Sequence, residues 1–223
     1  MYRLLKRIID LFIETVTLVL LSPILISVIR ILWVTGEHEV FYLQERIGYK
    51  NQPFKIWKFV TMKKNSSNVG TGEITIRNDP RVTKFGKLLR ISKINELPQI
   101  VNVFKDEMSI VGPRPLMEVS YNLYSEEVKK TIYSLKPGIT GIGSLIFRDE
   151  EKIISKANNP RIVYANIFPY KGELELWYNK NASLKTDFLI IFLTGWSILF
   201  PHNNLTKKFF KDLPNKNPGF SPD

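Results

Sequence analysis

The stretch RISKINELPQIVNVFKDEMSIVGPRPLM, which runs from Arg90 to Met117, combines a helical pattern with a proline-rich turn. Its apolar residues recur at helical spacing, which predicts an amphipathic helix from Leu97 to Lys105. Asn95 is placed to cap this helix, and Pro98 is tolerated only in its first turn. Glu96 would then lie among the free backbone N–H groups at the positive end of the helix, where anions such as phosphate bind.

A rigid turn follows this helix at Gly112-Pro113-Arg114-Pro115. It holds one guanidinium between two prolines, and a guanidinium is the natural bidentate partner of a phosphate group. Physical reasoning leaves two interpretations open. The segment is either a capped helix followed by a structural turn, or the anion-binding part of an active site.

The same residues carry a resemblance to a known family. The segments ELPQ at 96–99 and DEMSIVGPRPL at 106–116 are similar to those of the bacterial sugar transferases, which are monotopic polyprenyl-phosphate phosphoglycosyl transferases. In the family's usual DELPQ motif, the Asp is the nucleophile and the Glu holds magnesium. The resemblance therefore implies that Glu96 is a catalytic residue and the Mg²⁺ ligand. Asn95 stands at the position of the nucleophile.

Two segments that precede this block also match the family pattern. QERxG at 44–48 and PFxxxKF at 53–59 favour Lys58 as an active-site cation rather than a solvated surface lysine. Asp79-Pro80-Arg81 then resembles the family's DPRxT segment. By their positions, Arg81 and Arg90 are candidates to face phosphate, although both also suit the charged ends of a helix.

The resemblance continues after the proline-rich turn. PGITG at 137–141 is similar to a family loop whose glycines allow a ligand to approach the backbone closely. Arg148, which follows this loop, corresponds to a substrate-binding arginine. Pro113, Arg114 and Pro115 are implied to bind substrate as well.

The composition limits the kinds of partner. The 223 residues carry a formal net charge of +11, which suits nucleic acid, an anionic membrane face or phosphorylated substrates. Nucleic acid is the weakest of the three, because the basic residues are scattered among apolar stretches and no nucleic-acid motif is visible. The chain has no cysteine, and its two histidines, His38 and His202, are too few for a Cys/His metal cluster.

The N-terminal segment predicts an association with a membrane. Its uncharged part, Thr15 to Ile29, is shorter than the ~20 apolar residues of a transmembrane helix, and Ser22-Pro23 lies in its middle. Basic residues flank both ends, at Arg7 and Arg30, and positive flanks prefer the cytoplasmic side. A re-entrant helix that bends at Ser22-Pro23 is therefore favoured over a spanning helix or a signal peptide.

The remaining periodicities predict the other elements. We expect two short strands between His38 and Met62, around a turn at 50–53, and then a polar loop from Lys63 to Asn78 that could act as a lid. Asp79 is expected to cap the helix that ends near Arg90. An amphipathic helix is expected from Val119 to Leu135, and an interfacial or core helix from Ser183 to Leu199.

Together these elements predict an α+β fold that is mostly helical, with short strands, interfacial amphipathic helices and the re-entrant helix. The predicted parts are a membrane helix at 1–35, a phosphoglycosyl transferase domain on the cytoplasmic face of the bacterial inner membrane at 36–202, and a disordered tail at 203–223. A homodimer is compatible with the sequence.

The resemblance implies transfer of a sugar-1-phosphate from a nucleotide-sugar, such as a UDP-sugar, to polyprenyl phosphate. This reaction begins the assembly of lipid-linked glycans. Because Asn95 is a poor nucleophile, attack by Glu96, by Asp106 or by the lipid phosphate itself stays open. The alternative is a catalytically silent relative that holds polyprenyl phosphate or partner glycosyltransferases. A basic membrane-surface protein without a small-molecule site is the third hypothesis.

Overall fold

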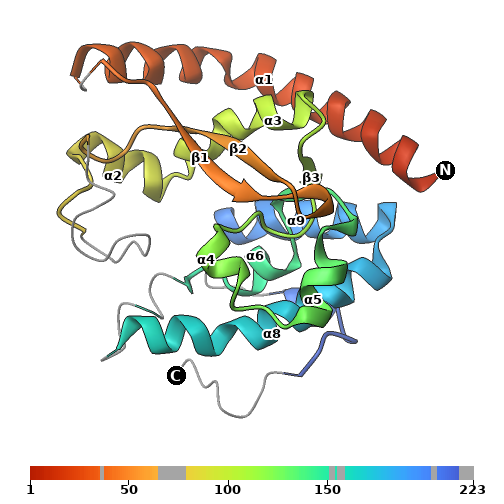
Figure 1. The fold of residues 1–223 in the computed structure, drawn as a ribbon. Helices are drawn as coiled ribbons and strands as arrows, with labels where there is room; N and C mark the ends of the chain where they lie inside the picture. Colours follow the sequence, from red (N-terminus) through yellow and green to blue (C-terminus); the bar gives the residue numbers. More distant parts are fainter. Residues whose placement is uncertain (36–37, 65–78, 151–153, 155–158, 202–204, 216–223) are drawn as a thin grey trace.

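The computed structural model describes residues 1–35, 38–64, 79–150, 154, 159–201 and 205–215. It is mostly helical, with two small sheets, and a long apolar helix, α1 (Tyr2–Thr35), lies along one side of the molecule (Figure 1). Helix α8 (Pro160–Asn181) lies at the opposite side. This agrees with the predicted fold class at the level of helices and short strands.

Helix α1 continues without interruption through Pro23. Proline has no N–H to donate to the carbonyl four residues earlier, which belongs to Val19. The Ser22 hydroxyl donates to that carbonyl instead, at 2.8 Å. The Val19 carbonyl therefore has a hydrogen-bond donor, and the helix is continuous at Ser22-Pro23, where the sequence predicted a bend.

The apolar and charged side chains of helix α1 are distributed as in a membrane-associated helix. It is long and apolar enough to cross a membrane by length and composition. Its apolar side chains, such as Phe12 and Leu20, are exposed, whereas Asp10 and Glu14 are buried against the domain. Asp10 accepts a hydrogen bond there from the Ser109 hydroxyl, at 2.6 Å. The helix therefore turns its acids toward the protein and its apolar side chains outward.

Strands β1 (Phe41–Ile47) and β2 (Pro53–Phe59) form the antiparallel hairpin predicted between His38 and Met62. The 3₁₀ turn η1 (Tyr49–Asn51) connects them, and Lys50 and Asn51 adopt positive φ angles. Gln44 pairs with Ile56, Arg46 with Phe54 and Tyr42 with Lys58. Because paired residues and every second residue share a face, these six side chains lie on one face of the hairpin.

The helix predicted at 97–105 begins earlier and in a tighter form. It is the 3₁₀ helix η3 (Ile94–Gln99), followed by α3 (Ile100–Phe104). Lys93, in a left-handed conformation with φ 60°, precedes η3. The prediction of Asn95 as the N-cap was wrong, because Asn95 lies inside the helical segment. Glu96 does lie in its first turn, as predicted.

The cap predicted for the preceding helix was also wrong. Helix α2 (Lys84–Ile91) is capped by Thr83, whose hydroxyl accepts from the Gly86 N–H at 2.9 Å. Asp79 is not available as a cap, because its carboxylate binds Arg81. The polar loop predicted after Met62 lies, from residue 65 to 78, outside the described residues.

Strands β3 (Ser109–Val111) and β4 (Gly138–Thr140) form a short parallel pair. The segment 137–141, predicted as a ligand loop, is therefore partly a strand. A Cβ on Gly138 would overlap the backbone of Gly112. Glycine is needed at positions 112 and 138 because the two backbone segments approach each other closely, whether or not a ligand also binds there.

The single helix predicted from Val119 to Leu135 is in fact three short pieces. They are α4 (Glu118–Tyr121), α5 (Glu126–Thr131) and the 3₁₀ turn η4 (Ile132–Ser134). Ser125 caps α5 by accepting from the Val128 N–H at 3.4 Å, and this starts a new helix. The helical spacing of apolar residues continues across the turn between α4 and α5, so the sequence pattern did not reveal that one helix ends and another begins there.

The main core lies between these pieces and the C-terminal helices α6 (Ile142–Ile146), α8 and α9 (Leu184–Leu199). Its fully buried side chains include Ile132, Ile142, Ile167, Phe168, Leu174, Tyr178 and Ile190. One face of α9 joins this core, while Phe188, Phe192 and Ile198 on α9 are exposed. A second cluster, made by Val28, Leu32, Phe59 and Leu89, joins α1 to the hairpin and α2.

The chain end differs from the predicted disordered tail in the part that the structure describes. Residues 205–215 contain the short helix α10 (Thr206–Phe209). Phe210 is buried against Trp177, with ring centroids 5.4 Å apart, and the Trp177 indole donates to Asp212 at 3.1 Å. The polar composition of the tail concealed this one aromatic anchor.

Candidate active site

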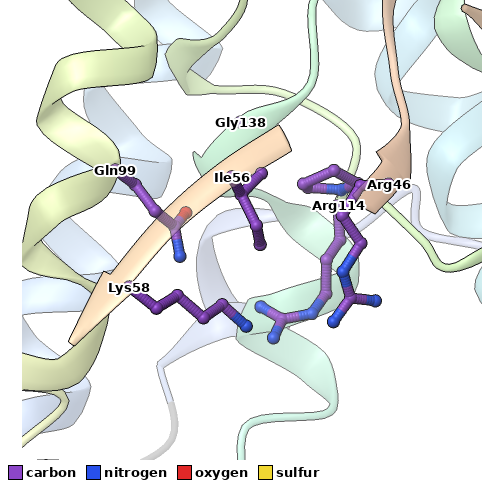
Figure 2. Close-up of a pocket in the computed structure, with 7 residues that line it drawn as sticks. Arg46, Ile56, Lys58, Gln99, Arg114 and Gly138 are labelled. Atoms are coloured by element: carbon purple, nitrogen blue, oxygen red, sulfur yellow. The ribbon is translucent and has the colours of Figure 1, made fainter. Parts of the chain in front are cut away.

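A pocket opens between the hairpin, the end of η3 and the proline-rich turn. It is lined by Arg46, Ile56, Lys58, Gln99, Arg114, Pro115 and Gly138. Figure 2 shows the Lys58 ammonium and the guanidinium groups of Arg46 and Arg114 directed into the same space. Three cationic side chains that converge on one space favour an anionic ligand, above all one with several phosphate oxygens.

The hairpin supplies two of these cations from one face. The Gln44 amide oxygen accepts from Arg46 Nη2 at 2.6 Å and from Lys58 Nζ at 3.2 Å. The neutral amide thus orients both cations without neutralising either. Arg46 Nε is buried and has no hydrogen-bond partner. A buried donor without a partner is costly, which is consistent with a site that is completed by a ligand.

Glu96 lies next to these cations. Its Oε1 is 3.6 Å from Arg114 Nη2. Burial alone would raise the pKa of the Glu96 carboxyl, but Arg114, Lys58, Lys93 and Arg46 outweigh that effect and lower the pKa to about 2. Glu96 is therefore ionised at neutral pH.

The two cations of the hairpin respond to burial in the opposite direction. Burial lowers the pKa of the Lys58 ammonium to about 7; Glu96 opposes this shift, whereas Arg46, Arg114 and Arg90 add to it. Burial, with repulsion from Arg114, lowers the pKa of Arg46 to about 10. Since a bound anion would relieve this repulsion, the pocket is electrostatically prepared for one.

The backbone around Arg114 is held rigidly from behind. The Tyr133 hydroxyl donates to the Arg114 carbonyl at 2.8 Å and accepts from the Leu116 N–H at 3.1 Å. The Gly138 N–H donates to the Pro113 carbonyl at 2.9 Å, and the Arg114 N–H donates to the buried carboxyl group of Glu175. The exposed guanidinium of Arg114 therefore stands on a fixed backbone.

Two arginines predicted for the site have partners of their own. The Arg81 guanidinium is buried against Asp79, with Nη2 and Oδ2 2.6 Å apart. Arg90 Nε donates to the Thr61 hydroxyl at 2.9 Å, although Arg90 lies near enough to act on the pKa of Lys58. Neither lines the pocket, so direct contact of either one with phosphate stays a prediction.

Arg148 lies at another place. Its guanidinium pairs with Asp149 at 3.1 Å and donates to the carbonyls of Ser197 and Pro201, at the end of α9. It is not among the residues that line the pocket. The predicted contact of Arg148 with substrate is not part of this structure and stays a prediction.

Sequence reasoning missed Arg46, Gln44 and Gln99 as site residues. Arg46 and Gln44 belong to the matched QERxG segment, and both share a strand face with Lys58. The alternation of the hairpin was a sufficient signal for these two residues, once Lys58 had been chosen. Gln99 is buried beside the pocket, and it is the last residue of the matched ELPQ segment, which was the available signal for it.

The side chain of Asn95 has a buried polar atom, Oδ1, that forms no hydrogen bond. Asn95 directly precedes Glu96, at the position where the family motif has Asp. A neutral amide oxygen can accept hydrogen bonds or bind a hard cation, but it is a poor nucleophile.

The pocket by itself does not suit a resident divalent cation. Within the described ranges, no group of three or more His, Cys, Asp and Glu side chains could hold a metal. Glu96 provides one carboxylate, and its neighbours are cations. The protein groups therefore fit Mg²⁺ only if further oxygen ligands arrive with a substrate.

Comparison with known proteins places these residues in context. The profile of the family described as "Bacterial sugar transferase" matches residues 1–201. The chain is 32% identical over 200 residues to the Aeromonas hydrophila UDP-N-acetylgalactosamine-undecaprenyl-phosphate N-acetylgalactosaminephosphotransferase, covering 89% of this chain and 44% of that protein. It is 34% identical over 195 residues to the Escherichia coli UDP-glucose:undecaprenyl-phosphate glucose-1-phosphate transferase, covering 86% and 39%. It thus spans less than half the length of either relative.

A shorter relative matches over most of its length. The exopolysaccharide production protein ExoY of Sinorhizobium fredii is 32% identical over 203 residues, which cover 85% of this chain and 83% of that protein. The match includes the hairpin, the proline-rich turn and α8, which together form and support the pocket.

Proposed function

The chain belongs to the bacterial sugar transferase family, and on that premise we propose that it transfers a sugar-1-phosphate from a UDP-sugar to a polyprenyl phosphate such as undecaprenyl phosphate. The observation that carries the proposal is the convergence of Arg46, Lys58 and Arg114 on one pocket beside Glu96. The names of the Aeromonas hydrophila and Escherichia coli relatives state a UDP-sugar and undecaprenyl phosphate as substrates. A site for a diphosphate is what such a reaction requires.

The reaction breaks the bond between the sugar-bearing phosphorus and the bridging oxygen of the diphosphate. Uridine monophosphate leaves with the bonding electron pair, and a new bond forms from the same phosphorus to an oxygen of the lipid phosphate. The negative charge that grows on the leaving group must be stabilised. Arg46, Lys58 and Arg114 would supply that stabilisation, and the rigid backbone behind Arg114 would keep its guanidinium in position.

Mg²⁺ fits this proposal as a companion of the substrate. Glu96 would hold it from the protein side, with phosphate oxygens as its other ligands. When bound, Mg²⁺ would neutralise charge on the diphosphate. The ionised state of Glu96 supports this role.

The identity of the nucleophile depends on Asn95. Asp106 is a weak candidate, because it is exposed and pairs with Arg7 at 2.9 Å and with Lys136. The remaining routes are attack by Glu96, followed by transfer to the lipid, and direct attack by the lipid phosphate. Direct attack needs no carboxylate at residue 95, so it is the route that suits this chain best.

The domain organisation is part of the proposal. We place residues 1–35 in the membrane as a re-entrant helix and residues 36–202 on the cytoplasmic face. The apolar outer surface of α1 and the basic residues at both of its ends support this arrangement.

One observation favours a second function. Asn95 lacks the charge of the family's nucleophile, while the cationic pocket is intact. A protein of this kind could hold polyprenyl phosphate, or a partner glycosyltransferase, without transferring a sugar. This hypothesis predicts ligand binding with no release of uridine monophosphate.

The test uses the full chain, purified in detergent, with undecaprenyl phosphate, Mg²⁺ and a panel of UDP-sugars. We expect release of uridine monophosphate with at least one sugar, dependent on the lipid. Arg46→Met, which removes one cation from the pocket lining, should release less uridine monophosphate than the parent. If UDP-sugars and lipid bind but the parent releases no uridine monophosphate with any sugar, the binding function replaces the transferase.

A further inference from the structure

The pocket and its surroundings carry an excess of positive charge. The pocket lining contains three cationic side chains, those of Arg46, Lys58 and Arg114. The Glu96 carboxylate lies beside them and already faces Arg114. The cations of the lining outnumber the Glu96 carboxylate even though burial lowers the pKa of the Lys58 ammonium to about 7, because Arg46 and Arg114 stay charged. A free divalent cation is repelled by such a site, and a phosphate-bearing anion is attracted.

Two buried polar atoms without hydrogen-bond partners are consistent with a site that binds an anion before a cation. Arg46 Nε is a buried donor that an incoming anion would satisfy. Asn95 Oδ1 is a buried acceptor in η3, one residue before Glu96 in the chain, and an amide oxygen is a suitable ligand for a hard cation. An amide oxygen and one carboxylate are too few for Mg²⁺ or Mn²⁺ by themselves. They become sufficient when phosphate oxygens supply the remaining ligands.

From these observations we propose that the pocket binds the diphosphate of the nucleotide-sugar first, and that the divalent cation enters only after it. Asn95 is the residue that makes metal binding conditional on the diphosphate. An aspartate at this position would add a negative charge, so it should raise the affinity of the protein for the metal in the absence of the diphosphate. The inference rests on the proposed function, since it assigns an order of binding to the same site.

The experiment measures the two ligands separately on the full chain in detergent. Calorimetry with UDP in the presence of EDTA reports binding of the anion without metal. Electron paramagnetic resonance of Mn²⁺, with and without UDP, reports binding of the metal, and Mn²⁺ with UDP but no protein is the blank. Pyrophosphate in place of UDP shows whether the diphosphate alone is sufficient.

We expect the parent to bind UDP in EDTA, to leave Mn²⁺ free when no UDP is present, and to bind Mn²⁺ once UDP is added. Glu96→Gln should bind metal-free UDP roughly fivefold more tightly, because a negative charge beside the anion is gone, and should lose the effect of Mn²⁺. Without UDP, Asn95→Asp should bind Mn²⁺ more tightly than the parent does. Arg46→Met should bind UDP weakly in both conditions.

The outcomes separate this inference from the proposed function. If the parent binds Mn²⁺ without UDP and Glu96→Gln does not, the order is wrong and the transferase proposal is unaffected. If UDP binds only when Mn²⁺ is present, the order is also wrong. If neither UDP nor pyrophosphate binds with or without Mn²⁺, both the order and the proposed function are overturned.

Discussion

At the scale of single residues, Arg114 is the side chain whose role depends most on its geometry. Its guanidinium is about half exposed, with a relative accessibility of 45%, while its backbone is fixed by Tyr133 and Glu175. Arg114→Lys keeps the charge but removes the bidentate fork. We predict that it lowers UDP affinity and the rate of uridine monophosphate release at least tenfold, as measured by calorimetry and a coupled assay.

Arg148→Lys is the matched control for that variant. Arg148 lies against the end of α9 and not in the pocket lining. Its replacement should therefore change UDP affinity less than twofold. Equal losses in the two variants would mean that Arg148 contacts the substrate, as its position in the sequence suggested. The residues that line the pocket would then not be the full set that binds the substrate.

Glu175 predicts a dependence of stability on pH. Burial raises the pKa of its carboxyl to about 8, although the Arg114 N–H and Lys171 lower it. The folded protein then keeps a proton on Glu175 that the unfolded chain releases from about pH 4.5 upward. The stabilising contribution of this group is therefore complete below pH 4.5 and is lost as the pH rises toward 8.

Glu175→Gln should remove this dependence, because glutamine keeps the shape of the protonated acid. Its Tm relative to the parent should rise between pH 5 and pH 8, on the order of 5 °C. Glu173→Gln is the control, since Glu173 is exposed on the same helix. A constant difference in Tm between Glu175→Gln and the parent across this range would show that Glu175 is ionised in the folded protein.

Asn95→Asp tests the route of the reaction. The two side chains differ little in volume, so the variant should fold normally. If the site is otherwise complete, the new carboxylate should form a covalent phosphosugar adduct at residue 95 in the absence of lipid. Intact-mass spectrometry after incubation with a UDP-sugar measures the adduct. A parent with rapid turnover, beside a slower Asn95→Asp variant without adduct, would exclude the two-step route for this chain.

At the scale of secondary-structure elements, α1 makes a prediction about topology. The helix has 34 residues, so it is about 51 Å long at 1.5 Å per residue, well above the ~30 Å thickness of a hydrocarbon core. Basic residues at both ends and the acids buried against the domain favour both ends on the cytoplasmic side. The natural chain has no cysteine, so single introduced cysteines report positions directly.

Arg3→Cys and His38→Cys should both react with a membrane-impermeant maleimide only from the cytoplasmic face. Pro23→Leu should shift some molecules toward a spanning topology, because it removes the residue that favours a bend. Labelling of Arg3→Cys and His38→Cys from opposite faces in the parent background would show that α1 spans the membrane.

The elements also show what the sequence could and could not predict. The hairpin at 38–62 was predictable, because alternation and a turn segment mark it clearly. The strand at Gly138–Thr140 was not, because three residues are too few for alternation to be visible. Periodicity placed the helix near Leu97 but could not reveal that it begins as a 3₁₀ turn after Lys93, whose left-handed conformation no pattern indicated.

For the site, the sequence identified the types of residue better than their contacts. Lys58, Glu96 and Arg114 were chosen from motif positions, and the structure brings them together. Arg81 and Arg148 were chosen in the same way, and each is held by a neighbouring acid. A motif specifies where an arginine stands in the chain, but the partner that captures its guanidinium depends on tertiary packing.

At the scale of the whole molecule, a chain of contacts joins α1 to the elements that support the candidate pocket. Lys6 on α1 pairs with Asp187 at 2.7 Å, and Asp187 also accepts from Tyr178 at 2.6 Å. Tyr178 lies on α8, the helix that carries Glu175 behind the Arg114 turn. This chain of contacts connects the element expected in the membrane to the backbone that carries Arg114, the arginine proposed to bind phosphate. With α1 in the membrane, these contacts would hold the pocket at a fixed distance from the membrane surface, where the lipid phosphate lies.

The most direct test of the transferase is the lipid product itself. Purified parent protein is incubated with a radiolabelled UDP-sugar, Mg²⁺ and undecaprenyl phosphate, and the organic extract is analysed by mass spectrometry. We predict a lipid diphosphate-sugar in amounts equal to the uridine monophosphate released, and at least tenfold less product with Arg114→Lys. Product that is unchanged by Arg114→Lys, or an extract that contains no sugar while UDP-sugar and lipid both bind, would contradict the account.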